Sequence, residues 1–103
     1  MAFSFSRLII SESDSVACKK AFELVDQMHP KAIQRGTASC VGEIGEYTIW
    51  LGFTRMGAPS WRCSCIHSEK PCVHTIALSI AWDRNRGVPD PSQENIDYLT
   101  KKH

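Results

Sequence analysis

Three cysteines and one histidine lie close together in the second half of the chain, with the spacing C-x-C-x6-C-x-H. They are Cys63, Cys65, Cys72 and His74. Three thiolates and one imidazole make a complete tetrahedral ligand set for a zinc ion. A small domain buries only a modest fraction of its surface, so a metal that cross-links it can contribute much of its stability. The spacing therefore predicts one structural Zn²⁺ and constrains the fold around it.

The spacing also predicts the local structure of the ligands. Residues two apart in a strand point to the same side, so Cys63 and Cys65 can bind one ion if the segment up to Cys65 is a strand. Residues two apart within a helix do not share a face. Cys72 and His74 can therefore chelate together only where a helix begins, and Pro71 suits that boundary. The predicted order is strand, loop and helix, with the metal at the corner.

Other interpretations of the thiols and imidazoles remain open. A disulfide between Cys63 and Cys65 would be strained, and no C-x-x-C redox pair is present. Iron could replace zinc in a recombinant sample, and His67 could replace His74 as the fourth ligand. The two cysteines outside the cluster are expected to be free thiols in a reducing cytoplasm, with a disulfide between them as the alternative. These are Cys18 and Cys40.

Length and composition exclude several classes of function. The 103 residues suffice for one small domain, and no apolar run approaches the length of a membrane span. The start of the chain lacks the order of charge, apolar core and cleavage site of a secretory signal. No phosphate-binding loop, G-x-S-x-G or H-E-x-x-H motif occurs, and zinc with four protein ligands has no open position for water. We expect a cytoplasmic protein that is not an enzyme, has no small-molecule substrate and does not bind membranes.

Hydrophobic periodicity predicts an α+β fold with an N-terminal helix, a small antiparallel sheet and a zinc-stapled strand-strand-helix finger. Apolar residues have helical spacing over 13–28, with Asp14 as a candidate cap. The residues before this helix favour a strand or an arm that docks on the core. Residues 33–65 favour a sheet of two or three strands, with a turn at 42–45. A short helix is expected over 93–99.

The chain divides into three predicted segments. Residues 1–30 form the arm and the amphipathic helix, residues 31–86 the finger module, and residues 87–103 a proline-containing link and the last helix. The helix after Cys72 has a second apolar face at Leu78 and Trp82, more than a small sheet needs. Either the N-terminal helix covers this face, or Leu78 and Trp82 form a protein interface.

The finger segment resembles the SWIM-type zinc finger, a family defined by C-x-C, a variable spacer and C-x-H in a strand-strand-helix unit. Arg35-Gly36 before a strand, the Tyr47–Leu51 strand and the apolar helix directly after C-x-H strengthen the likeness, which covers about residues 31–83. Small prokaryotic or archaeal members look most similar. The family's usual neighbouring domain is missing from this sequence, which favours a small adaptor or accessory subunit of a larger machine.

The resemblance implies binding, because SWIM modules are credited with DNA binding or protein contacts and none is known as a catalytic centre. One hypothesis is therefore a nucleic-acid-binding finger, in which basic residues contact phosphates and a tryptophan stacks on a base. The net charge of only +1 does not by itself indicate nucleic acid. The alternative is a protein-interaction adaptor with no nucleic-acid contact. The candidate nucleic-acid contacts are Arg55, Arg62, Lys70, Arg84, Arg86, Trp50 and Trp61.

Overall fold

A computed structural model of the chain describes residues 5–28, 30–35, 39–65, 70–85, 87–90 and 93–101. Helices and an antiparallel sheet are both present, which confirms the α+β class. No helix in these ranges has the length and apolar character needed to cross a bilayer. In chain order the elements are α1 (Phe5–Ser11), α2 (Ser15–Met28), β1 (Lys31–Arg35), β2 (Cys40–Ile44), β3 (Tyr47–Phe53), β4 (Pro59–Cys63), α3 (Val73–Asn85) and α4 (Gln93–Lys101).

The sheet has four antiparallel strands in the order β1-β2-β3-β4, more than the two or three that the sequence suggested. Strand β3 alternates as predicted, with Ile49 and Leu51 buried and Trp50 exposed between them. The turn before β3 lies later than expected, because Ile44 pairs with Tyr47 and Gly45 takes a positive φ of 59°. Gly42 belongs to β2 instead, where a Cβ atom would overlap the Leu78 side chain of α3. Close packing of strand on helix thus explains this glycine.

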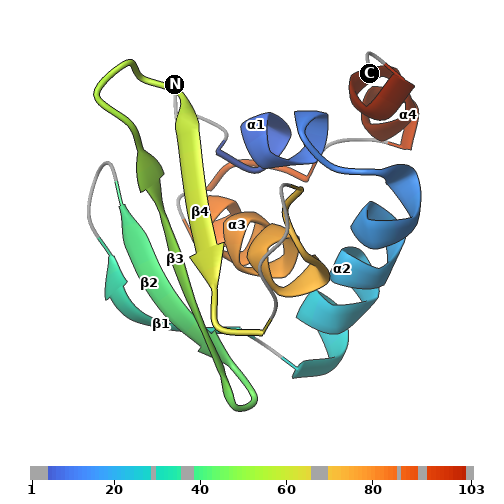
Figure 1. Cartoon of the computed structure of the whole chain (residues 1–103). Coiled ribbons are helices and arrows are strands. Elements are labelled where there is room, and N and C mark those ends of the chain that lie inside the picture. Colours follow the sequence, from blue (N-terminus) through green and yellow to red (C-terminus); the bar gives the residue numbers. More distant parts are fainter. Residues whose placement is uncertain are drawn as a thin grey trace.

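Helix α3 is the centre of the molecule. The helices lie on one side of the sheet, with α3 between the sheet and the N-terminal helices (Figure 1). Leu78 and Trp82 are only 1% and 2% exposed, so the prediction that they form a protein interface is wrong. The covering helices and the sheet bury both apolar faces of α3, which was the other explanation considered for its wide apolar surface.

Residues 5–11 form a helix rather than the predicted strand, and this helix docks on the core, as the alternative prediction of a docking arm had it. Phe5, Ile9 and Ile10 are fully buried, which is a helical spacing. The buried carboxylate of Asp83 on α3 accepts hydrogen bonds from the backbone N–H groups of Phe5, at 3.1 Å, and Ser6, at 2.8 Å. These groups have no partner inside a helix that begins here. Asp83, which is distant from α1 in the sequence, therefore caps and stabilises this helix.

The ends of the other helices match the sequence pattern more closely. Asp14 accepts a hydrogen bond from the Ala17 N–H at 2.8 Å, which confirms its role as the cap of α2. Helix α3 ends at Asn85, and Gly87 follows with a positive φ of 77°. Helix α4 occupies the predicted C-terminal position.

Replacing Asp83 should destabilise the protein strongly. Asp83→Ala leaves the first N–H groups of α1 without their acceptor in a buried setting, and we expect a loss of about 2–4 kcal/mol of unfolding free energy. Asp83→Asn keeps one acceptor oxygen and should lose less. Urea unfolding of both variants measures this, with Glu23→Ala on the exposed side of α2 as the control. A loss for Asp83→Ala no larger than that control would contradict the capping role.

The two cysteines outside the ligand cluster, Cys18 and Cys40, are buried and not joined by a disulfide. Burial, and to a smaller extent the nearby Asp14 carboxylate, together raise the pKa of Cys18 from 9.0 to about 11. The folded state therefore keeps this proton at a pH where the unfolded chain has lost it. The resulting stability is fully present below pH 9 and is lost as the pH rises toward 11.

Alkaline pH should therefore weaken the fold through Cys18. A difference of two pKa units corresponds to a loss of about 3 kcal/mol of unfolding free energy across this window. Cys18→Ala should lose less unfolding free energy over the same pH range, because it lacks the Cys18 thiol. The other groups that titrate there are the same in both proteins. Denaturant unfolding in steps of pH measures the two slopes. Parallel slopes for the two proteins would show that Cys18 does not titrate in this way.

Candidate metal centre

The predicted ligand cluster lies where the sheet meets the first turn of α3. Cys63 is the last residue of β4, and Cys65 lies two residues beyond it, so the strand is shorter than predicted. Cys72 directly precedes α3, and its carbonyl accepts the first helical hydrogen bond from the Ile76 N–H at 3.1 Å. Cys72 is thus the N-cap residue and His74 lies in the first turn, as the two-residue spacing predicted.

The four ligand atoms are arranged as a tetrahedral metal would require. The Sγ atoms of Cys65 and Cys72 are 3.6 Å apart, and His74 Nδ1 lies 3.8 Å from Cys63 Sγ and 3.9 Å from Cys72 Sγ. All four atoms lie within 4.8 Å of one another. Zn–S bonds of about 2.3 Å at tetrahedral angles place two sulfurs about 3.8 Å apart. Cys63, Cys65, Cys72 and His74 could therefore hold one metal ion, with Nδ1 as the imidazole ligand.

Neighbouring side chains orient two of these ligands. The Sγ of Cys72 lies 3.3 Å from Thr75 Oγ1 and accepts a hydrogen bond from the Thr75 N–H at 3.4 Å. The Tyr47 ring packs on the His74 ring with centroids 4.4 Å apart and an interplanar angle of 32°. Such outer contacts fix ligand orientation around metals. Neither contact was predicted from the sequence, although a threonine three positions after a helix-capping cysteine is a local signal.

The environment of the ligands favours different protonation states. Burial raises the pKa of the Cys63 thiol to about 12. Burial also acts to raise the pKa of Cys72, but hydrogen bonds from Thr75 and from the other two thiols outweigh it and lower that pKa. Burial lowers the pKa of His74, which favours the neutral imidazole that metals bind. Cys72 therefore loses its proton more readily than Cys63, and Cys63 has to lose its proton when a metal binds.

The candidate nucleic-acid contacts differ in how far the structure exposes them to solvent. Arg55, Arg62 and Lys70 are exposed, and Trp50 is 41% exposed. Trp61 is half-buried and packs against the core, so it offers less surface than expected. Arg86, like the alternative ligand His67, lies outside the described residues.

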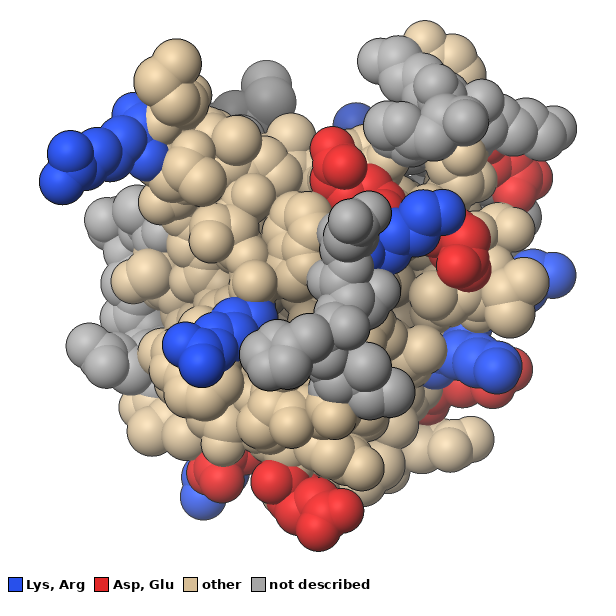
Figure 2. Space-filling model, in the orientation of Figure 1, with Lys and Arg blue, Asp and Glu red and all other residues tan. Residues whose placement is uncertain are grey.

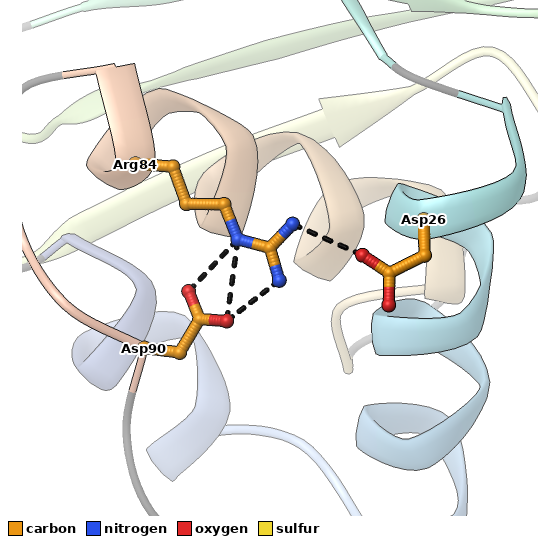
Figure 3. A network of polar contacts seen from close by, with 3 residues as sticks. All are labelled: Asp26, Arg84 and Asp90. Atoms are coloured by element: carbon orange, nitrogen blue, oxygen red, sulfur yellow. Dashed lines mark hydrogen bonds and ion pairs between the residues drawn. The ribbon is translucent and has the colours of Figure 1, made fainter.

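Arg84 does not belong to a free basic surface. Its guanidinium donates hydrogen bonds to both carboxylate oxygens of Asp90, the shortest at 2.6 Å, and to Asp26 at 3.2 Å (Figure 3). These contacts tie the end of α3 to the end of α2 and to the segment before α4. Two carboxylates offset its charge, so its predicted contact with phosphate is not supported.

Comparisons with known proteins assign this chain to no class, so its class is described from its fold and its candidate metal site. No family model, no curated protein and no solved structure matches this chain. The chain is an α+β domain in which three cysteines and one histidine could bind a metal between an edge strand and the central helix.

Metal binding should depend on the cluster and not on the other cysteines. Cys65→Ser replaces one thiolate with a weak ligand, so we expect it to reduce bound metal well below one equivalent. Cys40→Ala leaves all four ligands and serves as the matched control. Elemental analysis gives the stoichiometry, and Co²⁺ titration gives thiolate-to-metal absorption. Equal metal content in the two variants would contradict the assignment.

Thr75 should affect affinity without changing stoichiometry. Thr75→Val keeps the shape of the side chain but removes the hydroxyl beside Cys72 Sγ, and loss of such an outer contact lowers metal affinity by about 10-fold or more. Competition with a chelator of known affinity measures this change. Unchanged affinity would mean that the backbone N–H alone holds Cys72.

Proposed function

We propose that this chain is a non-catalytic, zinc-binding SWIM-type module that binds nucleic acid, with DNA the foremost candidate. It would act as a small accessory subunit of a larger assembly. The observation that carries this proposal is the position of the ligands: Cys63 and Cys65 end the β3–β4 hairpin, whereas Cys72 and His74 begin α3. A metal bound there ties an exposed basic hairpin to the centre of the core.

The hairpin has a composition that suits a phosphate backbone. From Tyr47 to Cys65 the sequence contains Arg55 and Arg62 and no acidic residue. Both arginines are exposed. Arginines on a protein surface supply most of the sequence-independent affinity for nucleic acid by contacting phosphates. The hairpin therefore supports nucleic acid as a ligand better than the nearly neutral chain as a whole does.

A structural role for zinc follows from the number and kind of ligands. Thiolates and imidazole suit zinc rather than magnesium or calcium. Four protein ligands fill its tetrahedron, whereas a catalytic zinc keeps one position for water or substrate. Zinc bound here supplies folding free energy by cross-linking β4 and α3. The lack of a disulfide at Cys18 and Cys40 is compatible with a reducing, intracellular location.

Removing the metal should unfold the site and abolish nucleic-acid binding together. A structural zinc can contribute on the order of 10 kcal/mol of folding free energy, so chelation should lower the melting temperature sharply. Circular dichroism with and without a chelator measures the first effect. An unchanged melting temperature would refute the structural role.

The nucleic-acid half of the proposal has its own test. Binding to labelled DNA and RNA, single-stranded and duplex, should weaken steeply with salt. Arg55→Ala and Arg62→Ala should each reduce the slope of log affinity against log salt by about one, whereas Arg7→Ala on α1 should not. Absence of binding to all these probes at micromolar protein and low salt would reject this function.

A further inference from the structure

The side of the sheet that faces away from α3 is partly uncovered. The helices lie on the other side (Figure 1), and α3 packs against all four strands from there. On β3 and β4 the uncovered side presents a set of residues that we call the open face. They are Thr48, Trp50 and Gly52 of β3, and Ser60 and Arg62 of β4.

Trp50 is the main feature of the open face. It pairs with Arg62 across the strands, and the Arg62 guanidinium carbon lies 5.6 Å from the centroid of the Trp50 ring. That distance is within the range of a cation–π contact, which holds both side chains in place. Trp50 nevertheless remains 41% exposed as a residue. A large aromatic surface is thus held against the sheet and left open to solvent.

Next to the Trp50–Arg62 pair, the open face has a depression at the Gly52–Ser60 pair. Gly52 has no side chain and pairs with Ser60, whose side chain is small. An open depression of about 330 Å³ lies here. Its lining includes Trp50 and Gly52 of β3, Ser60 and Arg62 of β4, and neighbouring residues of both strands. This volume is at the lower end of the range of about 300–1,000 Å³ for small-molecule sites. A flat group stacked on Trp50 has room in this depression.

The charge of this region suits an anion. Figure 2 shows basic side chains and uncharged surface over β3 and β4, with acidic side chains at the lower end of the sheet. The acidic residue of β2 on this side, Glu43, pairs in register with Lys31 of β1, which offsets its charge. Among the described residues no carboxylate pairs with Arg62. An aromatic ring near such a guanidinium can hold a base and its phosphate at the same time.

We propose that the open face is a stacking platform for single-stranded nucleic acid, with a base on Trp50, an adjacent group in the Gly52–Ser60 depression and a phosphate at Arg62. The proposal rests on the proposed function and narrows its ligand. A duplex keeps its base faces inside its own stack, so only unpaired bases can use such a platform.

Fluorescence anisotropy with three labelled probes of about 12 nucleotides tests this: oligothymidylate, oligouridylate and a DNA duplex. We expect at least one single strand to bind at least about 10-fold more tightly than the duplex. Trp50→Ala should weaken single-strand binding about 10-fold, and Trp50→Phe should keep most of it. Ser60→Glu, which places a negative charge in the depression, should also weaken it. Tyr98→Ala removes an exposed aromatic ring from α4 and should have no effect.

The possible failures are distinguishable. Duplex binding as tight as single-strand binding, or equal affinities for Trp50→Ala and Tyr98→Ala, would overturn the platform while leaving nucleic-acid binding intact. No binding to any probe would overturn both proposals. A Trp50-dependent dimer in sedimentation, without probe binding, would assign the open face to a second copy of the chain. Circular dichroism of each variant confirms that the fold is retained.

Discussion

The contact between the end of β4 and the beginning of α3 is the constraint on which the rest of the structure depends. The four ligand atoms lie within 4.8 Å of one another, so the three sulfurs could all be thiolates only if a cation compensated their charges. A divalent cation leaves a net charge of about −1, and the positive end of the α3 dipole, together with the Thr75 N–H, offsets part of it. A bound metal and a helix N-terminus would therefore both stabilise thiolates at this position, and the fold places the N-terminus of α3 there.

Helix α3 organises the molecule from both of its ends. Its N-terminal end supplies Cys72 and His74 to the cluster, and its middle is buried between the sheet and the N-terminal helices. At its C-terminal end, Asp83 caps α1 and Arg84 binds carboxylates on both sides. Helix α3 therefore connects the ligand cluster to elements that contain none of the ligands.

The features that could be predicted from the sequence are those that depend on the spacing of residues close together in the chain. The alternation of β3 and the Asp14 cap involve residues within a few positions of one another, and the ligand set spans only Cys63 to His74. The features that were missed depend on partners distant in the chain. Helix α1 takes its cap from a residue 77 or 78 positions away, and Arg84 reaches Asp26 across 58 positions. Likewise, Leu78 was predicted to lie in an interface because the sequence around it does not show that it packs against Gly42 of β2.

The metal centre and the proposed open face are linked by the two-residue period of β4. Cys63 pairs with Ile49 and faces the core, while Arg62 pairs with Trp50 and faces solvent. A slip of one residue in the register would turn the thiol outward and the arginine inward. Strand β4 is an edge strand, held by hydrogen bonds on one side only, so its register is among the least constrained in the sheet. Coordination of Cys63 to the ion that also binds α3 would remove this freedom, because only one register brings the sulfur to the cluster. A structural metal on one side of the sheet would thereby keep Trp50 and Arg62 aligned on the other.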